Sequence, residues 1–386
     1  MQRTLAIALL LSLLSVLGCQ SPAPPARTGE QPATGAAATP PTAPADAPTK
    51  SAQPAKRFRI MWSIYVGWMP WPYAAEAGIL KKWADRYNVE IELTQADYVP
   101  SIEAYVAGKA DGVVMTNMEA LNLAAAAGVD TTVAIIGDYS NGNDAVITRK
   151  GLGLCDLGGK DISIVEGSVS QYLLARGLTL DCAGKVSERD LKLVNTSDSD
   201  IGPGFVTNKN QDVLVTWNPI VLDVLSQVSD ARDVFDSARI PGEILDVLAI
   251  RTDTVQNSPE LVKALTGAWY ETLTMMRSNG PESAKAIAAM AEKSGSTQAQ
   301  YEKQLATTSM YWQPADAVAY ATSKKLPEAM QQVRSFSFDH GLFGEGTKSV
   351  DDIGITFPGG SVQGRPDAIK LRFTADFMQL AAGGQL

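Results

Sequence analysis

From residue 58 onward, short apolar runs alternate with longer stretches in which apolar residues recur every three or four positions. The short runs predict strands, and the longer stretches predict amphipathic helices. The expected strands are 58–64, 90–94, 112–115, 133–137 and 145–148, and the expected helices are 71–87, 100–107 and 118–127. This alternation indicates an α/β fold with a largely parallel sheet that is covered by helices on both faces.

A second set of elements follows. Residues 161–165 predict a strand, and Ser168 with Gln171 three positions later forms a capping box that begins a helix. Further strands are expected at 191–194, 212–216 and 244–251, with helices at 219–227 and from 258 to about 330. The chain should therefore leave one lobe near Thr148, build a second lobe and return near Glu243. Two such crossings predict a hinge with a cleft beneath it. The expected boundaries are 57–148 and 244–386 for the first lobe, which includes the end of the chain from 350, and 149–243 for the second.

The amino-terminus has the features of an export signal. A basic start at Arg3 precedes an apolar run over 5–17, which is shorter than a membrane span. The run ends in Val-Leu-Gly-Cys, which resembles the lipobox of bacterial lipoproteins. Residues 1–19 are thus expected to be a signal peptide with lipid attachment at Cys19, and an ordinary secretory signal is the alternative. Residues 20–56 are rich in Pro, Ala and Thr and predict a disordered tether or a simple disordered extension.

Charge and residue usage narrow the function classes. The 386 residues carry a net charge of -9, which argues against a nucleic-acid partner because such a partner calls for clustered Lys and Arg. A histidine-rich metal site or a Ser/His/Asp relay would have to be built around the single histidine, His340. Neither a metal nor a cofactor is therefore expected. In an oxidising compartment Cys155 and Cys182 are expected to form a disulfide, with two buried free thiols as the alternative.

The order of motifs resembles a known family. The segments YVGWMPW, DGVVMTNMEAL, SNGND, VTWNP and FDHGLFG are similar to those of solute-binding proteins from ABC importers of the nitrate, sulfonate and taurine type. Within that family they resemble a branch that is encoded beside urea carboxylase genes and assigned to urea or guanidine uptake. The resemblance implies a type II periplasmic binding protein whose two lobes close on one small molecule and dock on permease subunits. We expect a monomer in the periplasm or cell envelope that reaches the membrane only through its lipid anchor.

Three aromatic side chains are expected to line the cleft. Ligands of open α/β sheets bind outside the carboxyl ends of the strands, and strand 58–64 ends directly before Tyr65. Tyr65, Trp68 and Trp71 should therefore leave the sheet at the cleft, whereas Trp62 lies within the strand and is assigned to the core. Packing between the lobe's own elements is the alternative for these rings.

Polar and aromatic residues at the other expected strand ends complete the candidate site. They are Thr116, Asn117, Asp138, Asp144, Glu166, Ser168, Trp217, Asn218 and Glu243. Helix capping explains Asn117 as well as ligand binding does, and turn chemistry likewise explains Asp138 and Asp144. Glu243 is either a hinge residue or a ligand contact.

The charge of these residues predicts the charge of the ligand. An anion such as nitrate or a sulfonate would call for Arg, Lys or bare helix N-termini, and the candidate set contains no basic residue. Carboxylates pair well with a planar guanidinium, whereas neutral urea would leave a buried carboxylate unpaired. We therefore expect a small planar nitrogen compound, with guanidinium ahead of urea.

An enzyme and a sensor are the alternative functions. Thiamin-pyrimidine synthases resemble these binding proteins but use a histidine in the pocket, whereas His340 lies far along the chain. A lipoprotein that senses a ligand and signals to a membrane partner fits the sequence as well as a transporter does. We expect a binding protein and not an enzyme.

Overall fold

The computed structural model describes residues 54–278 and 280–386. The expected signal peptide, the lipidation site Cys19 and most of the expected tether lie outside the described residues. Within residues 54–278 and 280–386, none of the helices combines the length and the apolar character that crossing a bilayer requires.

The larger sheet contains nine strands among the described residues, in the order β13-β12-β14-β4-β10-β3-β1-β2, with β11 paired to β4. Its strands are β1 (Lys56–Trp62), β2 (Val89–Gln95), β3 (Gly112–Thr116), β4 (Thr131–Ser140), β10 (Leu245–Arg251), β11 (Thr308–Met310), β12 (Gly354–Thr356), β13 (Val362–Gln363) and β14 (Ile369–Phe373). We call this sheet and the helices around it lobe 1. Because β14 pairs with β4, the end of the chain belongs to lobe 1, where the sequence placed it.

The central strands of lobe 1 are buried along nearly their whole length. Every residue of β3 is buried, and so are the first six of β10. Near-continuous apolar runs of this kind are typical of strands that helices cover on both faces. The sheet is mixed: β1 runs parallel to β2 and β3, whereas β10 runs antiparallel to both β3 and β4. The amino end of β10 therefore lies at the same edge of the sheet as the carboxyl ends of β3 and β4.

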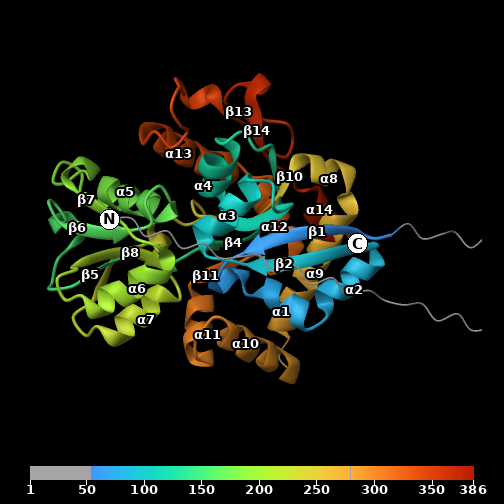
Figure 1. The fold of residues 1–386 in the computed structure, drawn as a ribbon, viewed down its shortest axis with the longest axis horizontal. Coiled ribbons are helices and arrows are strands. Elements are labelled where there is room, and N and C mark those ends of the chain that lie inside the picture. Colours follow the sequence, from blue (N-terminus) through green and yellow to red (C-terminus); the bar gives the residue numbers. More distant parts are fainter. Residues whose placement is uncertain (1–53, 279) are drawn as a thin grey trace, which may run out of the picture. The chain divides into compact units, whose positions relative to one another are not determined.

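The smaller sheet has the strand order β7-β6-β8-β5-β9. Its elements, drawn mostly in green in Figure 1, are β5 (Asp144–Thr148), β6 (Asp161–Ile164), β7 (Lys192–Asn195), β8 (Val213–Trp217) and β9 (Arg232–Asp236), with helices α5 (Val169–Asp181), α6 (Asp198–Thr207) and α7 (Ile220–Gln227). We call this group lobe 2.

The first crossing between the lobes lies earlier than the sequence predicted. Strand β5 was assigned to lobe 1, but it pairs with β8 and β9 of lobe 2. The chain thus crosses at 141–143, between β4 and β5, and the boundary at Thr148 was wrong. An apolar run reveals a strand but not the sheet that the strand joins. The return lies between β9 and β10, which agrees with the expected crossing near Glu243.

In lobe 1, two separate helices stand where the sequence predicted a single helix over 71–87. The lobe contains α1 (Pro70–Glu76), α2 (Ile79–Arg86), α3 (Tyr98–Val106), α4 (Asn117–Glu119), the π-helix η2 (Ala120–Ala125), α8 (Thr252–Asn257), α9 (Pro259–Arg277), α10 (Pro281–Lys293), α11 (Gln298–Ala306), α12 (Pro314–Ala321), α13 (Lys325–Asp339) and α14 (Asp376–Ala382). The helix expected over 71–87 is divided into α1 and α2 because Gly78 has a φ of 76°, which ends the first helix.

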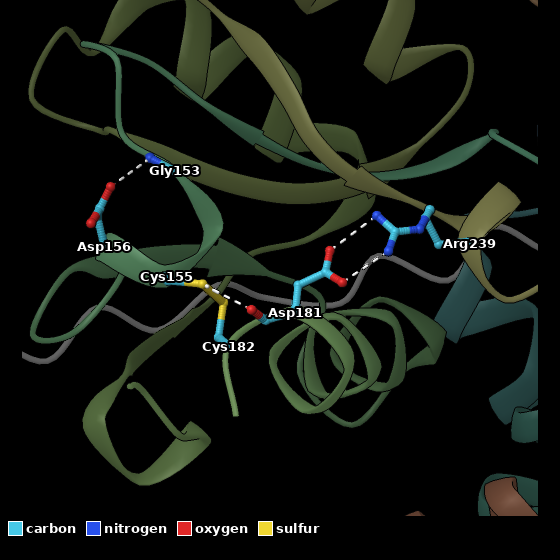
Figure 2. The surroundings of a disulfide bond; sticks show 6 residues. All are labelled: Gly153, Cys155, Asp156, Asp181, Cys182 and Arg239. Carbon is cyan, nitrogen blue, oxygen red and sulfur yellow. Dashed lines mark hydrogen bonds and ion pairs between the residues drawn. A yellow bond between two sulfur atoms is a disulfide. The ribbon is translucent and has the colours of Figure 1, made fainter. Parts of the chain in front are cut away.

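A disulfide joins Cys155 to Cys182, the pair that the sequence suggested (Figure 2). The two Cα atoms are 5.3 Å apart, and Cys182 directly follows the last residue of α5. Next to the bridge, the Arg239 guanidinium donates to both oxygens of Asp181 at 3.0 and 2.9 Å. The end of α5 is thereby tied both to the segment before β6 and to the return crossing.

Candidate ligand-binding site

Two carboxylates face each other across the central strands of lobe 1. Asp246 of β10 lies directly opposite Asp138 of β4, and on its other side it lies opposite Thr116 of β3. Side chains at directly opposed positions share one face of the sheet, with Cβ atoms about 5 Å apart. Both aspartates are buried. Like charges in this arrangement destabilise a sheet, so the pair calls for a reason other than stability.

Two more buried carboxylates extend this pair. Asp144 begins β5 and lies opposite Trp217, the last residue of β8. Glu119 ends the short helix α4 and is fully buried. Asp144 interacts electrostatically with Asp246 and with Glu119, so the four groups share one environment. We call Glu119, Asp138, Asp144 and Asp246 the carboxylate cluster; it draws on both lobes.

Basic side chains do not neutralise the cluster. In the described part of the chain, none of the four carboxylates forms an ion pair with Lys, Arg or His. Among the described residues, Asp138 and Asp246 have only each other and the Tyr65 hydroxyl as side-chain hydrogen-bond partners, and one of the two carboxyl groups must carry a proton to bond the other. A buried ion without a partner costs several kcal/mol, so the ionised cluster is unfavourable by itself.

Burial accordingly raises the pKa of every carboxyl group in the cluster. Burial raises the pKa of Asp144 to about 7, and the charge of Glu119 adds to this effect. The pKa of Asp246 is raised well above its ordinary value by burial and then by the charge of Asp138. For Glu119, burial raises the pKa although hydrogen bonds from Thr116 and Val169 oppose the shift. The cluster can therefore hold protons close to neutral pH.

A row of aromatic rings lies against the cluster. The ring centroids of Tyr65 and Trp68 are 5.0 Å apart, and Trp68 lies 5.5 Å from Tyr98. Tyr98 in turn meets Trp217 of lobe 2 edge-on at 5.5 Å, so the row crosses from one lobe to the other. The indole nitrogen of Trp68 is buried and has no hydrogen-bond partner among residues 54–278 and 280–386. Aromatic faces and carboxylates are thus gathered at one place.

One further ring of the predicted site has a packing role. Trp71 is buried and stacks on Trp269 of α9 with centroids 4.8 Å apart. Both indoles line a small cavity together with Trp68, Asp138 and Asp246. Trp71 therefore lies next to the cluster, and packing within lobe 1 buries most of the surface of its side chain.

Two side-chain amides of the predicted site, those of Asn117 and Asn218, bond to the segments where the chain crosses between the lobes. Asn117 accepts the N–H of Leu245 at 2.9 Å and donates to the carbonyl of Glu243 at 3.1 Å. Asn218 donates to the side chain of Asn143 at 2.8 Å, and Asn143 donates to the Tyr65 hydroxyl at 3.2 Å. These bonds join the two crossings to the strands, so the amide groups are already occupied.

Two predicted acidic contacts lie outside the cluster. Glu166 is exposed, and its own N–H donates to Asn195 at 3.1 Å. Glu243 is half-buried and receives two hydrogen bonds from Arg176, at 2.8 and 2.9 Å. It therefore already has a counter-charge, and its role as a hinge residue or a ligand contact stays a prediction. Ser168 caps α5 by accepting the N–H of Ser170 at 3.2 Å.

Sequence reasoning missed Glu119, Asp246, Tyr98 and Asn143. The rule that ligands bind beyond the carboxyl ends of strands holds for parallel strands, and Asp246 begins a strand that runs the other way. A signal was nevertheless present, because a lone Asp within the apolar run ILDVLAI is a charge that would be buried. Glu119 was read only as part of a helix.

A larger open pocket of about 870 Å³ lies apart from the cluster. It is lined by Tyr139, Tyr311 and Tyr320 near the return crossing. Because Tyr139 follows Asp138 along β4, its side chain points to the opposite face of the sheet. The charged side chains that line this pocket are of both signs, with Lys325 as well as Glu243 and Glu328, whereas those of the cluster are all acidic.

Gly67 sets how closely the Asp138 carboxylate can approach the aromatic loop. A Cβ atom at position 67 would lie 2.6 and 2.9 Å from the two Asp138 oxygens. We expect Gly67→Ala to displace Asp138 and to destabilise the fold by about 1–3 kcal/mol, because the surroundings are packed. Chemical denaturation measures the loss. Gly158→Ala is the control, since the atom nearest to its added Cβ lies at 3.8 Å, an ordinary contact distance; equal stabilities of the two variants would contradict this account.

His340 lies outside the cluster and joins α13 to the turn Glu188–Asp190 of lobe 2. Its Nδ1 is 2.7 Å from the carbonyl oxygen of Phe336, and its Nε2 is 2.6 Å from a Glu188 oxygen. Both partners are acceptors, so only the doubly protonated imidazolium satisfies both bonds. The hydrogen bond to Glu188 raises the pKa of His340. Both nitrogens of the His340 ring are therefore already engaged in hydrogen bonds.

The pH dependence of this contact can be tested. Because the folded-state pKa of His340 is raised, its contribution is complete below the unfolded-state pKa and is lost as pH rises through the folded-state pKa. We expect His340→Gln to lower the unfolding free energy by about 1 kcal/mol at pH 5.5, since the pair is partly exposed, and by less at pH 9. Thermal melts at both pH values measure this; a loss that is equal at both would show that the charge does not matter.

Solved structures of other proteins share this architecture. The alkanesulfonate-binding protein SsuA from Xanthomonas axonopodis pv. citri, bound to MOPS, superimposes with a TM-score of 0.61 at 19% identity, covering 76% of this chain and 96% of that one. The periplasmic aliphatic sulphonate-binding protein SsuA from Escherichia coli gives a TM-score of 0.61 at 17% identity, covering 75% of this chain and 94% of that one. The chain has the periplasmic-binding-protein fold. No family model and no curated protein sequence matches it.

The same fold also occurs in an enzyme. The desulfurization enzyme DSZB superimposes with a TM-score of 0.52 at 16% identity, covering 74% of this chain and 93% of that one. The periplasmic-binding-protein fold therefore admits both binding and catalysis, and the side chains of the site have to distinguish them.

Proposed function

We propose that this protein is the solute-binding component of an ABC importer and that it captures a small planar organic cation, with guanidinium as the favoured ligand. The observation that carries the proposal is the carboxylate cluster: four buried acidic side chains that no basic side chain of the described residues neutralises. A cationic ligand would supply the missing counter-charge. Its binding would then offset a cost that the protein otherwise bears alone.

The chemistry of the cluster suits a flat, many-donor cation, although the cavity lined by Asp138 and Asp246 measures about 10 Å³ and has to open to admit one. Guanidinium presents N–H groups in one plane and pairs with carboxylates through parallel hydrogen bonds. Asp138 and Asp246 lie opposite one another on neighbouring strands, and their hydrogen bond to each other requires a shared proton that a cation can replace. The faces of Trp68 and Tyr65 beside them can stack on a planar cation, an attraction worth about 0.5–2 kcal/mol for each ring.

The role in import rests on the fold and on the export signal. Two of the structurally similar proteins are sulfonate-binding proteins, and the one from Escherichia coli is periplasmic. The present chain shares their architecture, but its carboxylate cluster is negatively charged. In this proposal the cluster therefore binds a cation and not an anion. Closed lobes would dock on permease subunits, with lipid at Cys19 holding the protein at the membrane. A sensor would use the same site, and the location of the partner genes distinguishes the two roles.

A thermal-shift panel at pH 8 tests the class of ligand. Guanidinium and methylguanidinium at millimolar concentration should raise the melting temperature, because a ligand that binds only the folded state stabilises it. Nitrate and methanesulfonate should leave it unchanged, with sodium chloride as the control for ionic strength. Stabilisation by the anions alone would overturn the proposal.

A further inference from the structure

Two side chains of lobe 1 reach across to one turn of lobe 2. The N–H of Val169 donates to Oε1 of Glu119 at 2.7 Å, and the amide of Asn122 donates to the carbonyl of Gly167 at 2.9 Å. Glu119 and Asn122 are three residues apart, at the junction of α4 with the π-helix η2. π-helical turns inside helices are rare and frequently occur at functional sites.

Lobe 1 holds the Glu119 carboxylate in place. The Thr116 hydroxyl donates to its second oxygen, Oε2. The Tyr98 hydroxyl lies within hydrogen-bonding reach of the same carboxylate and also accepts the N–H of Thr116 at 3.0 Å. The carboxylate is therefore positioned from its own side before it meets lobe 2.

Lobe 2 offers a favourable partner for a negative charge. Val169 is the first residue of α5, a helix of 13 residues, and the first N–H groups of a helix have no partner within it. These groups and the helix dipole attract a negative charge. Glu119 thus occupies, from the other lobe, the position at which α5 binds anions best.

We infer that Glu119 is a positioning residue that latches the closed lobes, since its bond to Val169 joins lobe 1 to lobe 2 and forms only when they meet. The latch is coupled to the ligand site because Asp144 lies in the electrostatic field of Glu119. A cation at the cluster reduces the repulsion between these two carboxylates and so favours the ionised latch. The coupling to a ligand rests on the proposed function, but the bond itself does not.

Binding kinetics with guanidinium test the latch. A ligand enters the open cleft, so losing the latch should leave the association rate constant within about threefold and raise the dissociation rate constant at least tenfold. Glu119→Ala should show this effect in full. Glu119→Gln should retain part of the slow dissociation, because its amide oxygen still accepts the Val169 N–H. Glu103→Gln, an exposed change on α3, is the control.

Hydrogen exchange at the Val169 amide tests the bond without a ligand. In the ligand-free protein the lobes open and close, and the bond protects Val169 only while they are closed, so exchange there should be about two- to threefold faster in Glu119→Ala than in the wild type. Amides inside α5, such as that of Leu173, should be unchanged, which shows that the variant is folded. Equal exchange at Val169 in both proteins would overturn the latch. Faster exchange in the variant with no guanidinium binding in the wild type would keep the latch and reject the proposed ligand.

Discussion

Asp246→Asn should lose guanidinium affinity at least 100-fold and at the same time make the ligand-free protein more stable at pH 8. Asp246 is buried between Asp138 and Thr116 on the neighbouring strands. Removing one charge from a buried, hydrogen-bonded ion pair with a ligand typically costs several kcal/mol of binding free energy. Without a ligand, however, the same charge repels Asp138 and Asp144.

The gain in stability follows from the same geometry. An Asn amide at 246 has the shape of the carboxyl group and can donate to an Asp138 oxygen, as a proton shared between the two aspartates does. We expect the unfolding free energy to rise by about 1–3 kcal/mol, since the Asn amide keeps the hydrogen bond to Asp138 without burying a second negative charge beside it. Calorimetric titration and thermal melts measure the two effects.

The exposed Glu166 provides a matched control. Glu166→Gln removes one carboxylate charge at a strand end outside the cluster. It should change neither the affinity nor the stability beyond about 0.5 kcal/mol. If Asp246→Asn lowered both stability and affinity, the cluster would be structural and the account of a ligand site would fail.

Ligand affinity should rise steeply between pH 5.5 and 7 and level off above it. Burial raises the pKa of Asp144 and that of Asp138 to about 7, so both groups carry protons at the lower end of that range. A cation binds the ionised cluster and displaces these protons. For each proton that binding releases, the dissociation constant falls about tenfold per pH unit. This dependence ends at the pH where the group is already ionised in the ligand-free protein.

The ligand-free protein should show the opposite trend. Because the folded-state pKa values are raised, the folded chain binds more protons than the unfolded chain between about pH 4 and 7. Its stability should therefore fall by about 1.4 kcal/mol per pH unit for each such group, and then become constant.

Calorimetric titration with guanidinium in buffers of different ionisation enthalpy counts the protons that binding releases. Affinity that does not change with pH would show that the cluster is not the binding site.

The sequence predicted the architecture better than the contacts. Alternating strand and helix patterns were enough to predict two α/β lobes with a return near Glu243, because local periodicity reflects which face of an element is buried. Strand β5 went to the wrong lobe because pairing partners are distant in sequence. Strand direction has the same origin, and it explains why Asp246 was missed.

The candidate site shows the same division. Tyr65, Trp68, Asp138 and Asp144 are all buried, although Asp138 and Asp144 belong to β4 and β5 and do not follow a strand, and their contact with a ligand stays a prediction. Glu166 follows a strand as they do, yet it is exposed. Whether a side chain at a strand end faces the cleft depends on the turn that follows it. Glu243 has a partner, Arg176, that lies 67 residues earlier, and no local pattern reveals such a pair.

Guanidinium and urea are nearly the same size and shape and differ in charge, so titrating both into the protein at pH 8 tests the role of the carboxylate cluster most directly. The account predicts saturable binding of guanidinium at one site, with urea at least 100-fold weaker. Urea binding as tightly as guanidinium, or binding of nitrate in place of either, would contradict it.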